Sequence, residues 1–112
     1  MTDAEIIAEA MELARWRKEF GPRLDAKKAR ATKLGHLHRA ASDLAMDGFD
    51  TSKALSIIDS ELLSLRAEIA VLECQERVWR DLDIQLYHDH IVGTSLTKTV
   101  RESLAAAGLP HI

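Results

Sequence analysis

Apolar residues recur every three or four positions through the second half of the chain, from Thr51 to about His90. The residues that carry this pattern are Leu55, Ile58, Leu62, Leu65, Ile69, Leu72, Trp79 and Leu86. Because an α-helix turns once in about 3.6 residues, the spacing places these side chains on one helical face. No Gly or Pro interrupts the segment. The pattern therefore predicts one helix of roughly forty residues, about 60 Å long.

The same spacing appears in reverse order upstream, at Leu34, Leu37, Ala41 and Leu44. If the two segments run antiparallel, the residue numbers of every facing pair sum to 99. The facing pairs are Leu44 with Leu55, Ala41 with Ile58, Leu37 with Leu62, and Leu34 with Leu65. Between the segments, Gly48 suits a helix C-cap, and Asp50 or Thr51 suits the next N-cap. The sequence therefore predicts an antiparallel helical hairpin of the coiled-coil kind.

Further helices are expected at both ends of this hairpin. Thr2 and Glu5 have the spacing of a capping box, so a first helix begins there. Pro22 follows Gly21 and is expected to end or kink that helix, because Pro lacks the amide hydrogen of an interior position. The second helix then runs from about Pro22 to Met46. A last, short helix is capped by Ser95, presents Leu96, Val100 and Leu104 on one face, and is closed by Gly108 and Pro110.

The direction of the first helix is left open by the pattern. If it is collinear with the second helix, the pairing continues, with Phe20 facing Trp79 and Leu13 facing Leu86. If it folds back, it covers the far side of the third helix. In either case the chain is expected to be all-α, with residues 1–112 forming a single domain.

A second apolar face is expected on the third helix, opposite the hairpin seam. Together with the broad apolar stripe of the first helix it leaves more apolar surface than one chain covers, which is typical of an interface. The residues predicted for this interface are Ile6, Leu13, Trp16, Leu63, Ala67, Ala70, Val71, Cys74 and Val78. The expected partner is a second copy, so that a helical bundle forms by dimerisation. Within this face Cys74 is expected to be a small buried residue.

Positive charge is concentrated in the segment Arg15–Arg39, although the chain as a whole has a net charge of −3. Such a basic segment is typical of helices that contact phosphates. The candidate nucleic-acid contacts are Arg23, Lys27, Lys28, Arg30 and Lys33. The hairpin pairing offers another interpretation, in which Arg23, Lys27 and Arg30 face the chain's own acidic residues around Glu68, Glu73 and Glu76.

The histidines and other chemically active residues do not have the spacing that a catalytic or metal-binding site requires. His36 and His38, like His88 and His90, are two positions apart, which places them on opposite sides of a helix. There is no nucleophile motif or glycine-rich phosphate loop. We therefore expect no enzyme activity, no cofactor and no metal. Around the hairpin turn, Asp47, Phe49 and Asp50 form a candidate contact at an acidic tip.

These features favour a non-enzymatic helical protein–protein interaction module with an adaptor, assembly or regulatory role. Its expected partners are itself, as a homodimer, and an unidentified protein. The alternative is a nucleic-acid-binding or transcription-regulating protein that uses Arg15–Arg39. The single cysteine, an N-terminus unlike a signal peptide and the lack of a spanning segment predict a cytoplasmic protein without membrane contact.

Overall fold

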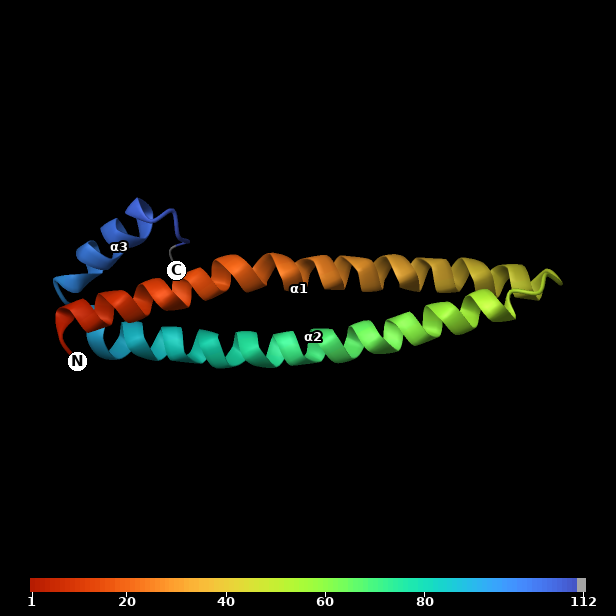
Figure 1. Cartoon of the computed structure of the whole chain (residues 1–112), viewed down its shortest axis with the longest axis horizontal. Coiled ribbons are helices and arrows are strands. Elements are labelled where there is room, and N and C mark those ends of the chain that lie inside the picture. The colour runs from red at the N-terminus through yellow and green to blue at the C-terminus, as the bar shows by residue number, and fades with distance from the viewer. Residues whose placement is uncertain (111–112) are drawn as a thin grey trace. The chain divides into compact units, whose positions relative to one another are not determined.

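The computed structural model describes residues 1–110, in which every regular element is helical. The elements are α1 (Asp3–Met46), α2 (Ser52–Leu86), the π-helix η1 (Tyr87–Ile91) and α3 (Leu96–Ala106) (Figure 1). The contacts among these residues define two compact units. One contains residues 1–22 and the chain from Cys74 onward, and the other is Arg23–Glu73. The all-α prediction is confirmed.

α1 is one helix from Asp3 to Met46, so the helix boundary predicted at Gly21 and Pro22 is wrong. An interior proline removes one backbone hydrogen bond and costs about 3 kcal/mol. Packing before and after the proline offsets this cost, since Ala14 and Leu24 are both buried. The hydroxyl of Thr2 accepts a hydrogen bond from the Glu5 amide at 3.3 Å, as the capping box predicts.

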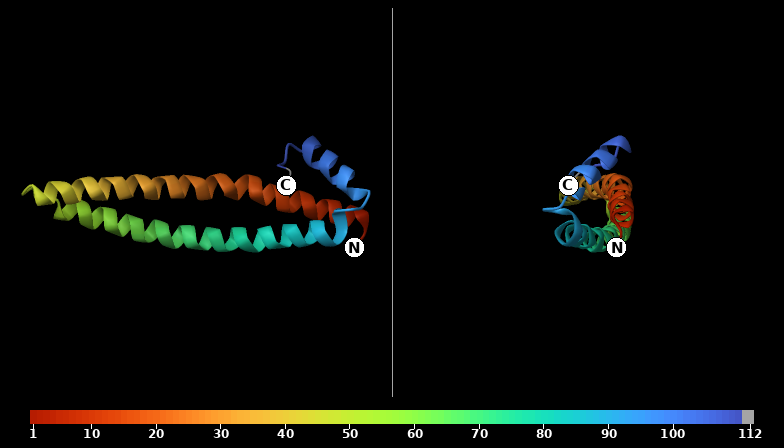
Figure 2. Two further views of the ribbon diagram at one scale, coloured as in Figure 1. Left: turned by 180° about the vertical axis from the view of Figure 1, so that it is seen from behind. Right: turned by 90° about the vertical axis from the view of Figure 1, so that its left-hand side faces the viewer.

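In the unit Arg23–Glu73, α1 and α2 run antiparallel and are joined by a short turn, as the left view of Figure 2 shows. The core of this unit consists of Leu34, Leu62 and Leu65, with Ala31 and Ile58 packed against it. The predicted pair Leu34 and Leu65 is therefore brought together. Leu37 and Leu44 were predicted to lie in the same seam, but both are about half exposed. They lie about 60–80° around α1 from Leu34, and a single partner helix does not cover that edge.

The turn between α1 and α2 is stabilised by caps on both helices. Gly48 has a φ of +94°, which a residue with a side chain rarely adopts. This conformation lets the Phe49 amide donate a hydrogen bond to the Leu44 carbonyl at 3.1 Å. On the other side, the Asp50 carboxylate accepts a hydrogen bond from the Ser52 amide at 3.2 Å. Gly48 and Asp50 thus have the predicted capping roles.

The other unit combines the first turns of α1 with the end of α2, η1 and α3, and α3 lies beside α1 in both figures. Its buried core consists of Ile6, Ala10, Leu13, Ala14, Leu86, Ile91, Leu96, Val100 and Leu104. The predicted apolar face of the last helix is confirmed. The predicted cap is not, because Thr94 rather than Ser95 accepts the hydrogen bond from the Leu96 amide, at 3.2 Å.

The aromatic residues of this unit support the antiparallel pairing of residues 1–22 with the end of α2. The ring of Trp16 stacks on Trp79 with a centroid distance of 5.6 Å, and on Phe20 at 5.1 Å. Trp79 therefore faces Trp16, one helical turn from the predicted Phe20. Leu13 and Leu86 share one core cluster, as the collinear alternative predicts.

The end of α2 widens into a π-helical turn where a continuous α-helix to His90 was predicted. There the Val92 amide donates a hydrogen bond to the carbonyl of Tyr87, five residues earlier, at 2.7 Å. The turn buries Ile91 completely. A π-turn of this kind is rare and occurs where packing demands one more residue in the helix.

Replacing Leu62 with Ala should lower the free energy of unfolding by about 2 kcal/mol, because its removal leaves a space that the seam closes only in part. Replacing the exposed Leu37 with Ala is the matched control and should cost no more than about 0.5 kcal/mol. Urea unfolding followed by far-UV circular dichroism measures both. Equal losses for the two variants would contradict the placement of the seam.

Candidate protein interaction surface

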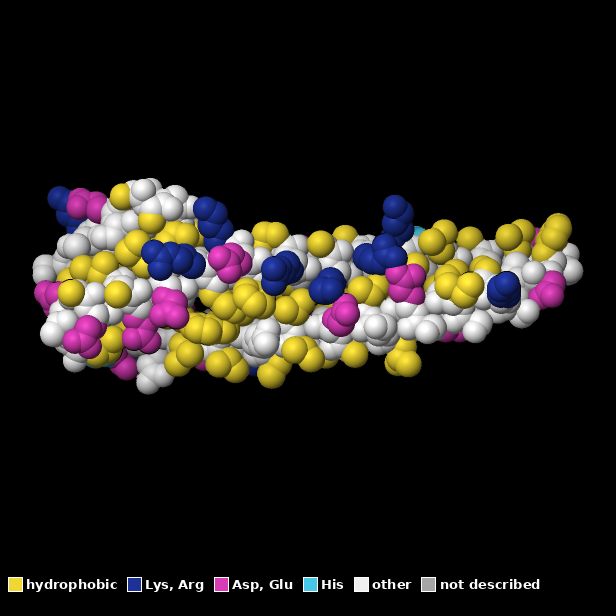
Figure 3. All heavy atoms as spheres, in the orientation of Figure 1, with side chains coloured by type: hydrophobic (Ala, Val, Ile, Leu, Met, Phe, Trp, Pro, Cys, Tyr) yellow, Lys and Arg dark blue, Asp and Glu magenta, His cyan; other side chains and the backbone are white. Residues whose placement is uncertain are grey.

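One face of α2 exposes a row of apolar side chains that we call the exposed stripe. It consists of Leu63, Ala67, Ala70, Val71, Cys74 and Val78. The exposed fractions of Leu63, Val71 and Val78 are 72%, 58% and 54%. Figure 3 shows hydrophobic side chains at the surface along α2. Cys74 is also exposed, because no helix among residues 1–110 covers this face, so the burial predicted for it is not found within the single chain.

An open hollow of about 470 Å³ continues the exposed stripe within the unit Arg23–Glu73. Its lining includes Ala67 and Val71 of the stripe, together with Leu72. Lys27 and Glu68 complete the lining and form an ion pair at 2.8 Å. The apolar surface is therefore wider than the stripe alone and has a charged border.

The predicted interface residues of the first helix are placed differently. Ile6 and Leu13 are buried in the core of their own unit, and Trp16 is partly buried in its stack with Trp79. The prediction for these residues assumed that one helix could not cover the apolar face of residues 6–16 in α1. In the structure α3 and the end of α2 share that task, with Leu104 of α3 fully buried in the same core. These three residues are therefore not part of the exposed surface.

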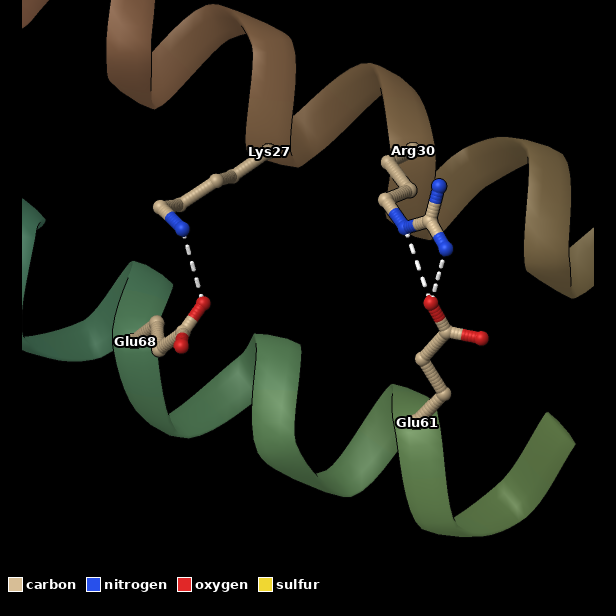
Figure 4. A network of polar contacts seen from close by, with 4 residues as sticks. All are labelled: Lys27, Arg30, Glu61 and Glu68. Carbon is tan, nitrogen blue, oxygen red and sulfur yellow. Dashed lines mark hydrogen bonds and ion pairs between the residues drawn. The ribbon is translucent and has the colours of Figure 1, made fainter. Parts of the chain in front are cut away.

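Within the unit Arg23–Glu73, cations of the basic segment form ion pairs with carboxylates of α2. The pairs are Lys27 with Glu68 at 2.8 Å, Lys28 with Glu73 at 3.2 Å, and Arg30 with Glu61. In Figure 4, Lys27 and Arg30 extend from α1 toward carboxylates on α2. The hairpin pairing predicted Lys27 near Glu68, but it did not include Lys28 among the paired cations or Glu61 among their partners. Lys27, Lys28 and Arg30 thus have carboxylate partners, and Arg23 also interacts within the chain, while Lys33 is exposed on α1.

A buried polar cluster lies in the other unit, beneath the π-turn. Asp83 is only 3% exposed, and its Oδ2 atom lies 3.3 Å from Nε of Arg17. Within residues 1–110, Arg17 Nε, Asp83 Oδ1 and the Tyr87 hydroxyl have no hydrogen-bond partner. Asp83 follows Trp79 by four residues in the apolar pattern of α2. The residue numbers of Arg17 and Asp83 sum to 100, close to the sum of 99 in the hairpin pairing. This sum and the position of Asp83 in the apolar pattern are signals by which the sequence could have revealed the pair.

The environment of this cluster favours uncharged acids. Burial raises the pKa of Asp83 above its ordinary value of 3.8, and the Arg17 guanidinium opposes this effect. Burial also raises the pKa of Tyr87, and the neighbouring Asp83 charge adds to it. Because Asp83 is buried and Arg17 is only partly exposed, we expect this cluster to affect the stability of the unit.

The predicted tip contact is divided between structural and exposed residues. The Asp50 carboxylate accepts hydrogen bonds from the amide and hydroxyl of Ser52, and these bonds lower its pKa. Asp47 is exposed, and the ring of Phe49 is 63% exposed. Of the three residues, Phe49 is the one that offers apolar surface to another molecule.

His38 and His88 each pair with a neighbouring carboxylate. His38 Nε2 lies 3.0 Å from Asp59 Oδ1, and His88 Nδ1 lies 2.9 Å from Asp89 Oδ1. The bond with His88 lowers the pKa of Asp89. Across the described part of the chain, no three His, Cys, Asp or Glu side chains are grouped so that they could hold a metal ion. Nor does any helix among residues 1–110 combine the length and the hydropathy that crossing a bilayer requires.

Comparisons with protein-family models, with curated proteins and with solved structures give no match to this chain.

Proposed function

We propose that this chain is a non-enzymatic helical protein–protein interaction module, with an adaptor, assembly or regulatory role in the cytoplasm, and that the exposed stripe of α2 is its contact surface. The observation that supports this most is the exposure of Leu63, Val71 and Val78 on one face of a helix. The opposite face, with Leu62 and Leu65, is already buried. Burying one Val or Leu side chain gains about 1.5–3 kcal/mol, so a partner that covers the stripe is strongly favoured.

The form of the surface suits a helical partner. Apolar residues spaced three and four apart along one helix match a second helix that has the same spacing. Arg66 and Glu73 border the stripe and would select a partner by charge. The basic segment of α1 supports a nucleic-acid function less well, because carboxylates of α2 already pair with Lys27 and Arg30.

A photo-crosslinking amino acid at Leu63 tests this function in cells that produce the chain. We expect a discrete protein adduct that disappears when Val71 is also replaced by Glu, because a charge in the stripe opposes its burial. The matched control places the same crosslinker at Lys33, which is exposed on α1. Equal protein adducts at both positions, no adduct at Leu63, or nucleic-acid adducts at Lys33 would contradict the proposal.

A further inference from the structure

We propose that the exposed stripe of α2 binds the same stripe of a second copy of this chain, with the two helices antiparallel and in a single register. Facing residues in the centre of the contact have numbers that sum to 137. This inference rests on the proposed function, because it names the partner of that surface. Three rows of residues along α2, one central and two flanking, carry it.

The central row has the alternating spacing of three and four that paired helices use in their contact face. It consists of Ser56, Ser60, Leu63, Ala67, Ala70, Cys74, Arg77 and Asp81, all of which are exposed. A sum of 137 places Leu63 against Cys74 and Ala67 against Ala70. The polar residues then lie at both ends of the contact. The small side chains in its middle allow the helix axes to approach to about 8 Å.

The first flanking row carries alternating charges. It consists of Asp59, Arg66, Glu73 and Arg80, each seven residues from the next. In an antiparallel pair with two-fold symmetry, each flank meets the same flank of the other copy. Each residue of this row lies one position before a residue of the central row; Arg66, for example, precedes Ala67. When the central residues face each other with a sum of 137, residues of this flanking row therefore face each other with a sum of 139. Arg66 then faces Glu73, and Asp59 faces Arg80, each twice per dimer.

Other registers lose this complementarity. A shift by seven residues in one direction brings Arg66 against Arg80 and Glu73 against its own copy. A shift in the other direction brings Arg66 against its own copy and Asp59 against Glu73. A parallel pair places Arg66 beside the apolar flank, at Val71, with no opposite charge. The sum of 137 is therefore the register that the charges select.

The second flanking row is apolar where the first is charged. It consists of Ile57, Ser64, Val71 and Val78, again seven residues apart. In the same register Ile57 faces Val78, and Ser64 faces Val71. The pairing thus covers three apolar side chains that are each more than half exposed in the single chain.

The charged flank has room for these new partners. The side chain of Arg66 has no hydrogen bond or ion pair with any residue in the described part of the chain. Glu73 contacts Lys28 through Oε1, and Asp59 contacts His38 through Oδ1. The second oxygen of each carboxylate can therefore accept a bond from an arginine. Arg80 is paired with Glu76 of its own helix, but that side chain is 62% exposed and can turn.

The mass of the purified chain tests the pairing. Light scattering at micromolar concentration should give twice the chain mass of 12.5 kDa. Ala70→Glu should return the mass to that of one chain, because two carboxylates would enter the centre of the contact. The matched control Ala40→Glu, at an exposed position of α1, should remain a dimer. A wild-type chain of single mass overturns the inference.

Charge reversal tests the flank. Arg66→Glu should weaken the dimer at least about tenfold in Kd, since two like-charged pairs replace two favourable ones. Adding Glu73→Arg to this variant should restore the affinity. Failure of the double variant to recover, with circular dichroism showing intact helices, would contradict the register.

A disulfide tests the register directly. Leu63→Cys should form an intermolecular disulfide with the native Cys74 in oxidised glutathione, because the two positions face each other. Leu63→Cys with Cys74→Ser should form none, because position 63 lies eleven residues, about 16 Å, from its own copy. A disulfide between two native Cys74 residues would show a different pairing and overturn the inference. If the chain is monomeric but the crosslinker at Leu63 still captures another protein in a Val71-dependent manner, the proposed function stands without self-pairing.

Discussion

Replacing Arg17 with Met should lower the free energy of unfolding by about 3 kcal/mol at pH 7. The Met side chain preserves most of the packing that Arg17 provides, but it leaves the Asp83 carboxylate buried without a counter-charge. Removing one partner of a buried ion pair is costly, because the remaining charge stays out of water. Urea unfolding followed by far-UV circular dichroism, at one fixed protein concentration, measures the loss.

The loss in Arg17→Met should shrink as the pH falls toward 4. The pKa of Asp83 is raised in the folded chain above its ordinary value of 3.8. At a pH between the unfolded and the folded pKa of Asp83, this carboxyl group is protonated in the folded state and ionised in the unfolded state. The contribution of Asp83 to stability is therefore full below pH 3.8 and is lost as the pH rises through the folded pKa. Without Arg17 that pKa rises further, so protonation relieves the variant at acid pH.

The double variant Arg17→Met with Asp83→Leu is the control for this argument. It removes both charges and fills the site with apolar atoms, so it should recover most of the stability that Arg17→Met loses. If the double variant is as unstable as Arg17→Met, the loss comes from packing around Arg17 and not from the buried charge of Asp83.

The helices that could be predicted are those defined by local signals. The apolar spacing around Leu34 and Leu65 determined the antiparallel pairing in the unit Arg23–Glu73. Gly48 marked the end of α1, since the positive φ that it adopts is required by the local geometry of that turn. The face of α3 followed from three apolar residues spaced four apart, of which Leu104 is fully buried.

The features that could not be predicted depend on contacts between distant segments. Pro22 lies inside α1 because packing on both of its sides offsets the missing hydrogen bond. The π-turn at Tyr87 depends on the burial of Ile91 against α1 and α3, which no local pattern encodes. For the same reason Leu37 was assigned to a seam whose width only the two-helix geometry determines.

The candidate surface was predictable in part. The second apolar face of α2 could be read from the spacing of Leu63, Ala67 and Val71, and the structure leaves that face uncovered. Its use as an interface stays a prediction. Ile6 and Leu13 were assigned to the same surface because the apolar stripe of the first helix was expected to be too wide for one helix to cover. The burial of Ile6 and Leu13 depends on η1 and α2 closing the remaining sides.

Replacing Leu104 with Ala should lower the free energy of unfolding of its unit by about 3 kcal/mol. The side chain is fully buried where α3 meets α1, so its removal leaves a cavity among residues that are already packed. Val92→Ala, at a residue 65% exposed and outside α3, is the control and should cost no more than about 0.5 kcal/mol.

Because Trp16 and Trp79 both belong to this unit, tryptophan fluorescence reports its unfolding, while far-UV circular dichroism reports all the helices. In Leu104→Ala the fluorescence transition should move to lower urea than the circular dichroism transition, since the seam at Leu34, Leu62 and Leu65 is untouched. Transitions that shift together would show instead that the two units unfold as one.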